Sequence, residues 1–113
     1  MAPILELRYY LDSDGESPFE DWFQSLDATA AARVSVTLVR LEKGNLSSVK
    51  PVGEGVLEYR MDWGPGYRVY FGRDGAVLVI LLTGGTKRRQ PQDIAEAKAL
   101  WTDYRQRRKP PAK

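Results

Sequence analysis

The sequence predicts a small α+β domain with the element order β-α-α-β-β-β-α. Three observations predict it. Apolar residues recur at helical spacing within residues 17–43 and again within residues 90–104. Residues 4–11, 58–71 and 76–83 carry strand patterning and are bounded by turn residues. A chain of 113 residues can bury one real core and is too short for two domains. We expect a curved, mostly antiparallel sheet with the helices on one face, which leaves the other face available for a ligand.

The first half of the chain predicts a strand followed by a helical hairpin. Residues 4–11 form the strand, and the Asp-Ser-Asp-Gly sequence that follows is a turn. Ser-Pro-Phe-Glu at 17–20 begins a helix, because it supplies an N-cap, a proline at the first helical position and a capping-box glutamate. Asp27 caps a second helix, which Gly44 ends. Residues 45–55, rich in Ser, Gly and Pro, predict a loop.

The next segment predicts a β-hairpin, and its register follows from its side-chain pattern. With residues 64–66 as a three-residue loop, one face carries only apolar and aromatic side chains, namely Tyr59, Met61, Trp63, Tyr67, Val69 and Phe71. The other face carries Glu58, Arg60, Asp62, Arg68 and Tyr70. A purely structural interpretation of this polar face is a cross-strand ion pair between Asp62 and Arg68, which that register places opposite one another.

The last part of the chain predicts a central strand and a final helix. Residues 76–83 are apolar on both faces, as expected for a strand inside a sheet. Gln-Pro-Gln-Asp at 90–93 begins the helix, whose buried stripe is Ile94, Ala97, Trp101 and Tyr104. We therefore expect a single domain over residues 1–104 and a basic, flexible tail over residues 105–113.

Composition excludes several kinds of chemistry. The chain has no cysteine and no histidine, which removes disulfides, thiolate catalysis and the commonest general base and metal ligand. We expect no cofactor and no metal site. The longest apolar run, residues 76–82, is far too short to cross a bilayer, and the N-terminus lacks the features of a signal peptide. The prediction is a cytoplasmic protein with no membrane partner.

Charge is distributed unevenly along the chain. Residues 1–83 contain 8 Lys and Arg against 12 Asp and Glu, whereas residues 84–113 contain 9 against 3. A basic end on a mildly acidic body attracts nucleic acid or an acidic protein. A solvated basic tail that only aids solubility explains the same counts.

The polar hairpin face and the segment after the central strand together predict a phosphate-binding surface. Arginine inside a strand is costly unless its face is wet or engaged with an anion. We expect Arg60 and Arg68 to line a basic groove, with Lys87, Arg88 and Arg89 at its edge. The guanidinium fork holds phosphate oxygens in pairs. The Gly-Gly-Thr-Lys sequence at 84–87 lacks the spacing of a Walker loop, which disfavours a nucleotide triphosphatase.

The same residues suggest how RNA cleavage would proceed without histidine. The 2′-hydroxyl of RNA can attack the neighbouring phosphate, so the protein needs only to orient it, stabilise charge and move protons. Lys87 and Glu58 are candidate general bases. Tyr70 is a candidate proton donor, and its ring on the polar face could instead stack a base.

Four motifs then make the chain recognisable. They are Leu-Glu-Tyr-Arg at 57–60, Gly-Pro-Gly-Tyr-Arg-Val-Tyr at 64–70, Leu-Leu-Thr-Gly-Gly-Thr-Lys-Arg-Arg-Gln at 81–90 and Asp-Ile-Ala-Glu-Ala at 93–97. The resemblance that these motifs carry extends over nearly the whole chain and includes the early Ser-Pro-Phe-Glu-Asp-Trp sequence. The sequence resembles the RelE/ParE toxin superfamily and, within it, the HigB-like addiction module killer proteins.

The resemblance implies a toxin of a type II toxin-antitoxin system, with a RelE-like fold and a cognate helix-turn-helix antitoxin similar to HigA as its partner. Many relatives cleave mRNA on the ribosome, so it implies a ribosome-dependent endoribonuclease, or mRNA interferase, that inhibits translation. By the matching motifs, the resemblance implies that Arg60, Arg68 and Lys87 are the site residues, and secondarily Tyr70 and Gln90. ParE-like relatives instead inhibit DNA gyrase without being enzymes. A degenerate toxin kept as a complex-forming partner is a third reading.

Overall fold

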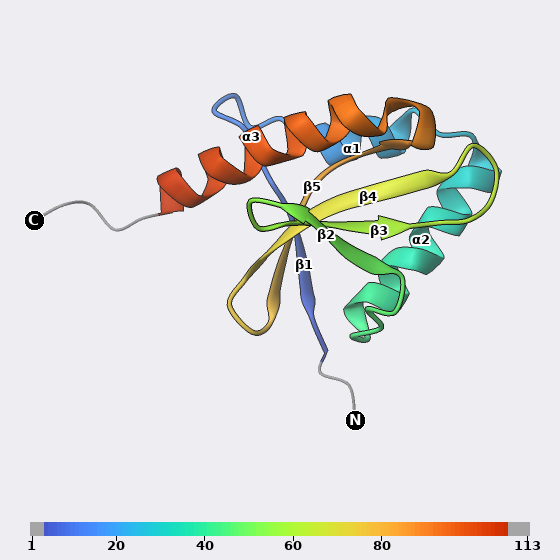
Figure 1. Ribbon diagram of the computed structural model, residues 1–113, viewed down its shortest axis with the longest axis horizontal. Coiled ribbons are helices and arrows are strands. Elements are labelled where there is room, and N and C mark those ends of the chain that lie inside the picture. The colour runs from blue at the N-terminus through green and yellow to red at the C-terminus, as the bar shows by residue number, and fades with distance from the viewer. Residues whose placement is uncertain (1–3, 109–113) are drawn as a thin grey trace, which may run out of the picture.

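The fold is described from a computed structural model, over residues 4–108. The elements in chain order are β1 (Glu6–Tyr9), α1 (Pro18–Gln24), α2 (Ala28–Glu42), β2 (Val49–Gly53), β3 (Val56–Arg60), β4 (Tyr67–Asp74), β5 (Leu78–Thr86), a 3₁₀ turn (Lys87–Arg89) and α3 (Gln90–Arg108). The strands form one sheet in the order β1-β5-β4-β3-β2, curved as Figure 1 shows. β1 pairs with β5 in parallel, and the remaining pairs are antiparallel. The predicted α+β class and the mostly antiparallel sheet are confirmed. Within these residues, no helix is both long and apolar enough to cross a membrane.

Both predicted helix starts on the first half of the chain are confirmed in detail. The Ser17 side chain accepts a hydrogen bond from the Glu20 backbone N–H, and the Asp27 carboxylate accepts one from that of Ala30. Each cap satisfies a backbone donor that the first turn of a helix leaves free. The two helices are therefore specified locally by short sequences that sit immediately before them.

The prediction of a loop over residues 45–55 was wrong, because β2 lies within it. Pro51 and Gly53 lower the strand propensity of this segment, but β2 is at the edge of the sheet, where a proline is tolerated. Its partner β3 supplies the hydrogen bonds on one side only. The additional strand places Lys50 directly opposite Glu58.

Helices cover both faces of the sheet, not one as predicted (Figure 1). One core joins α1 and α2 to the sheet through Phe19, Val34, Leu41, Val69 and Phe71. A second core joins α3 to the opposite face through Tyr70, Ile80, Leu82, Ala97 and Trp101. The physical reason is that the central strand β5 is apolar on both sides, so each side needs a cover. We call the two surfaces the α1–α2 face and the α3 face.

Two consecutive glycines allow helices to approach β5 from both sides. Gly84 and Gly85 follow the predicted strand over residues 76–83, and the structure places both inside β5. A Cβ on Gly84 would lie 2.2 Å from the Trp22 ring, and one on Gly85 would lie 1.8 Å from Asp93 Oδ2. The space that a side chain on each glycine would fill is thus occupied by a residue of α1 on one face and by a residue of α3 on the other.

The hairpin of β3 and β4 keeps the predicted faces but changes partners. The structure pairs Arg60 with Arg68 and Glu58 with Tyr70, which is a shift of two residues from the predicted register. An even shift moves no side chain to the other face, since side chains alternate with a period of two. Asp62 is consequently not opposite Arg68, and the predicted ion pair between them does not form.

The C-terminal end is more ordered than predicted. Helix α3 continues through Arg108, so residues 105–108 are helical and are not part of a tail. Residues 109–113 of the predicted tail lie outside the described residues. Trp101 is buried in the core against β4 and β5, and Tyr104 packs against the same core, so these two side chains hold this half of α3 beside the sheet.

Candidate phosphate-binding site

The centre of the candidate site is the carboxylate of Glu58, which is completely buried. Arg60 Nε lies 2.6 Å from Glu58 Oε1, and Gln90 donates a hydrogen bond of 2.8 Å from Nε2 to Oε2. Arg68 Nε lies 3.9 Å from Oε2. One carboxylate therefore joins side chains from β3, β4 and the start of α3.

Strand pairing explains why the carboxylate is needed there. Arg60 and Arg68 are direct cross-strand partners, and like charges in that position repel one another. Glu58 is two residues before Arg60 on the same face, so its carboxylate is within reach of both guanidinium groups. The arginines that the sequence places in strands are held by an internal counter-charge.

Arg68 and Lys87 meet at the hairpin loop. Arg68 donates from Nη1 to the Gly66 carbonyl oxygen at 2.7 Å, and the Lys87 backbone N–H donates to the Pro65 carbonyl oxygen at 3.3 Å. Gly66 has a φ of +76°, and a Cβ there would lie 3.1 Å from both Arg68 Nη1 and Lys87 Cβ. The loop therefore brings the exposed Lys87 beside Arg68, whose side chain is only 6% exposed.

Tyr70 does not reach solvent. It is completely buried in the core beneath α3, and its hydroxyl has no hydrogen-bond partner among the described residues. Burial, and after it the nearby Glu58 carboxylate, raises the pKa of the Tyr70 phenol. The hydroxyl stays protonated at neutral pH, but α3 covers it. The sheet face that we expected to be open for base stacking at Tyr70 is closed.

Glu58 is poorly suited to the role of general base. Burial alone would raise its pKa, but hydrogen bonds from Arg60 and Gln90 hold the pKa of this carboxylate below its ordinary value. A carboxylate with a lowered pKa binds a proton weakly. The geometry makes Glu58 an internal anchor for the arginines.

The remaining predicted residues divide into two groups. Arg88 and Arg89 are exposed on the 3₁₀ turn, and Arg89 Nε lies 3.8 Å from Asp93 Oδ1. Gln90, predicted to contact RNA, is half-buried and donates its amide to Glu58. The cations that face solvent near this end are Lys87, Arg88, Arg89 and, in part, Arg60, whose side chain is 36% exposed.

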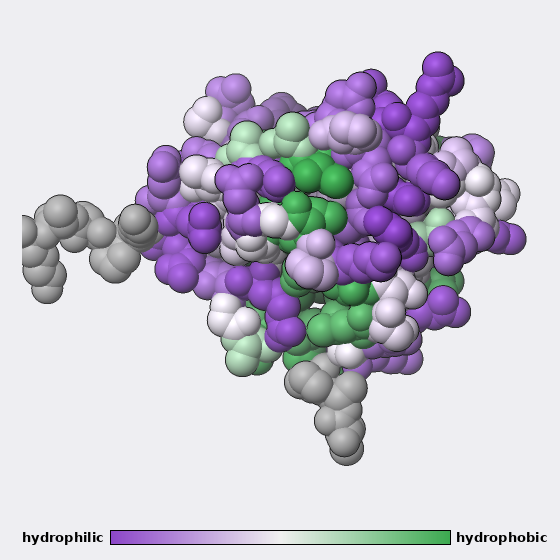
Figure 2. All heavy atoms as spheres, viewed as in Figure 1, coloured by the Kyte–Doolittle hydropathy of each residue, from purple (hydrophilic) through white to green (hydrophobic). Residues whose placement is uncertain are grey.

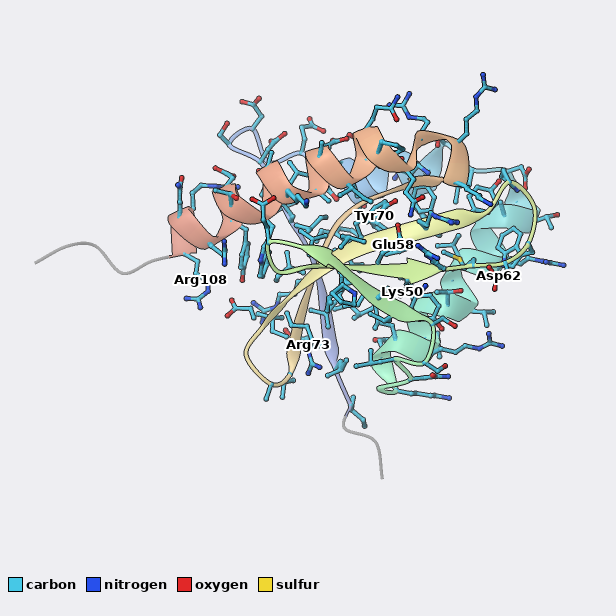
Figure 3. All side chains as sticks on the ribbon, viewed as in Figure 1. Lys50, Glu58, Asp62, Tyr70, Arg73 and Arg108 are labelled. Atoms are coloured by element: carbon cyan, nitrogen blue, oxygen red, sulfur yellow. The ribbon has the colours of Figure 1, made fainter. Side chains whose placement is uncertain are left out.

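The structure adds Lys50, which the sequence analysis missed. A pocket of about 370 Å³ lies beside Arg60 and is lined by Ser47, Ser48, Val49, Lys50, Arg60 and Asp62. The lining has two cations, two serine hydroxyl groups and one carboxylate, that of Asp62, so its charge and donors suit an anion. Figure 3 labels Lys50 and Asp62. Lys50 was missed because its segment was predicted to be a loop. The signal available was the β-branched pair Val49 and Val52 around it.

Comparison with known proteins gives one informative match. No family model matches the chain. An uncharacterized protein of Haemophilus influenzae is 43% identical over 83 residues, which are 73% of this chain and 84% of that protein. The chain belongs to the same protein family as this Haemophilus influenzae protein.

Proposed function

We propose that this protein is the toxin of a type II toxin-antitoxin system and acts as a ribosome-dependent mRNA endonuclease. The proposal rests on the RelE/ParE resemblance of the motifs at 57–60, 64–70 and 81–97. The single observation that supports it in the fold is the buried Glu58 carboxylate. It draws together residues from three of the four motifs that carry the resemblance, namely Arg60, Arg68 and Gln90.

The arrangement supports phosphate binding more than proton transfer. Arg60 is fixed by Glu58 and still partly exposed beside the Lys50 pocket, so its guanidinium is held in place before a ligand arrives. Fixed cations stabilise the negative charge that develops on the phosphate oxygens during attack by the 2′-hydroxyl. Arginine cannot act as a base, and Tyr70 and Glu58 are buried. Lys87 is left as the exposed candidate for proton transfer.

A partner follows from the same proposal. A toxin of this kind is neutralised by an antitoxin, which we propose to be a small helix-turn-helix protein that is HigA-like. We propose that it covers the Arg60 and Lys87 end of the sheet or the basic C-terminal half of α3. A footprint confined to α1 and α2 in a hydrogen-exchange comparison of free and bound protein would contradict this.

The test is controlled expression of the wild type, of Arg60→Ala with Lys87→Ala, and of Arg40→Ala in a bacterium. Arg40 is an exposed arginine on α2. Its replacement is the control, because it removes one positive charge at a place away from the site. We expect growth arrest and mRNA cuts in phase with codons for the wild type and the Arg40 variant. The double variant should lose both, while its melting temperature stays close to that of the wild type.

Two outcomes would reject the proposed reaction. Intact mRNA together with trapped gyrase–DNA complexes would assign the protein to the gyrase inhibitors. Growth without arrest for the wild type, with mRNA and supercoiling unchanged, would reject toxicity itself. Mapping mRNA 5′ ends and plasmid supercoiling in the same cultures separates these outcomes.

A further inference from the structure

A second basic pocket lies at the far end of β4 from Arg60 and Arg68. It has a volume of about 290 Å³, and its walls come from the end of β4, the β2–β3 turn and the last turns of α3. Its charged and aromatic lining consists of Arg73, Asp74, Trp101, Arg105 and Arg108. Arg73 is the fifth residue after Arg68 on β4, which is about 17 Å along a strand. The two sites share no residue.

Two of the three guanidinium groups are held in position by neighbours. Arg108 Nε lies 2.9 Å from Asp74 Oδ2, and the same oxygen accepts a hydrogen bond of 2.6 Å from the Tyr104 hydroxyl. Arg105 lies over the Trp101 ring, 5.8 Å from its centroid, in a cation–π contact. Since Trp101 is itself buried, it acts as a fixed platform for the Arg105 side chain.

The third guanidinium has unused hydrogen-bonding capacity. Arg73 donates from Nη2 to the Ala76 carbonyl oxygen at 2.6 Å, whereas its Nε is buried without a hydrogen-bond partner in the part of the chain described. Within residues 4–108 neither Arg73 nor Arg105 has a carboxylate oxygen within 4.0 Å. A buried unpaired N–H is costly, and the two guanidinium groups without a carboxylate leave a positive charge at this end of the described protein that an anion would neutralise.

Charge at this end of the molecule is also out of balance. The pocket contains three guanidinium groups and one carboxylate, Asp74, which is already engaged by Arg108 and Tyr104. Arg73 and Arg108 both line this pocket; Figure 3 labels them at the same end of the molecule, where Figure 2 shows many hydrophilic residues. The surplus of N–H donors has no matching acceptors within the described part of the protein.

We propose that this pocket is a second phosphate-binding site, separate from the one at Arg60. A carboxylate offers two acceptor oxygens, whereas a phosphate group offers three or more and up to two negative charges. Arg73 and Arg105 line this pocket together without a carboxylate partner within residues 4–108, and their N–H donors outnumber the two oxygens of a carboxylate, so a phosphate matches them better. The phosphate is either a free one, as in inorganic phosphate or a mononucleotide, or part of an RNA backbone. The proposal does not depend on the protein being a toxin.

The test for phosphate uses the side-chain Nε–Hε signals of arginine in a ¹⁵N-labelled full-length protein. On titration with inorganic phosphate, we expect signals of Arg73 and Arg105 to shift and saturate, and the Arg40 signal to stay in place. The variant Arg73→Gln with Arg105→Gln should abolish the saturating shift at Arg108, whereas Arg40→Gln should not. If the Arg73 change unfolds the protein, Arg105→Gln alone is informative, because Arg105 is exposed.

A second measurement separates RNA from free phosphate. Binding of a labelled single-stranded oligouridylate is followed by fluorescence anisotropy at several salt concentrations. If the phosphate belongs to RNA, the double variant should lower the slope of log affinity against log salt by about 2 relative to wild type. An unchanged slope with saturable phosphate binding assigns the pocket to free phosphate.

Two results would overturn the proposal. One is the absence of a saturating shift at Arg73 and Arg105 with both inorganic phosphate and RNA. The other is binding of an oligoglutamate peptide at this pocket with a higher affinity than phosphate, which would indicate an acidic protein partner. Failure of the toxin proposal has a different signature, namely wild-type protein that binds phosphate here and causes no growth arrest.

Discussion

Arg60 and Arg68 lie directly opposite one another on β3 and β4, and the buried carboxylate of Glu58 lies 2.6 Å from Nε of the first and 3.9 Å from Nε of the second. Two like charges in adjacent strands would separate without it. Arg68 is nearly inaccessible, while Arg60 is partly exposed. The pair thus combines an internal structural cation with one that a ligand can reach.

Replacing Glu58 with Gln should lower the free energy of unfolding at pH 7 by about 2–3 kcal/mol, because removing one partner leaves the buried Arg68 without a counter-charge. Urea denaturation followed by tryptophan fluorescence measures the change. Arg60→Gln is the matched variant and should cost about 1 kcal/mol or less, since Arg60 is partly exposed. Equal costs for the two variants would contradict the assignment of Glu58 as the anchor.

The contribution of Glu58 should also depend on pH with a definite sign. Its pKa in the folded protein is lowered from 4.5, so the folded state favours the charged carboxylate. The stabilisation is present above pH 4.5 and is lost as the pH falls through the folded pKa. The difference in unfolding free energy between wild type and Glu58→Gln should be constant above about pH 6 and shrink below pH 4.5. A difference that grows on acidification would contradict this.

Replacing Gly85 with Ala should destabilise the fold, because the new Cβ would lie 1.8 Å from Asp93 Oδ2. Overpacking of this kind costs about 1–3 kcal/mol. The combination with Asp93→Ala should recover part of the loss, since the obstructing carboxylate is gone. A double-mutant cycle by thermal or urea unfolding measures the coupling, and strict additivity would show that α3 does not pack here as described.

Removing Lys50 should weaken RNA binding in a way that does not depend on sequence. Lys50 lines the pocket beside Arg60, and a lysine there would contact phosphate oxygens. Lys50→Ala should reduce the salt slope for single-stranded RNA by about 1. Lys43→Ala is the matched control, because Lys43 is exposed at the end of α2. Equal effects of the two changes in anisotropy titrations would mean that only net charge matters.

Replacing Tyr70 with Phe should leave stability unchanged or raise it, because a buried hydroxyl without a partner contributes no favourable hydrogen bond and is costly to bury. In the proposed toxin, growth arrest should persist, since α3 covers this hydroxyl. Chemical denaturation and the growth assay test the two halves separately. A loss of arrest with unchanged stability would restore Tyr70 as a proton donor and require movement of α3.

Much of the local structure could be predicted because its causes are local. Ser17 and Asp27 cap their helices through backbone groups three residues away. The side chains on each hairpin face could be predicted because side chains alternate with a period of two along a strand. The observed register differs by two residues, so it leaves these faces unchanged. β2 could not be predicted in this way, since Pro51 and Gly53 have low strand propensity and the strand exists because β3 offers it hydrogen bonds.

The sequence by itself determined the α+β class, the helix starts, the side chains that share each hairpin face and the absence of histidine and cysteine chemistry. Only the tertiary structure decided which of those side chains face solvent. Helix α3 crosses the polar face, buries Tyr70 and supplies Gln90 to Glu58, while its last turns bring Arg105 and Arg108 beside Arg73. The physical reason is that alternation fixes the side of the sheet on which a residue lies, whereas burial and ion pairing depend on what packs there from elsewhere in the chain.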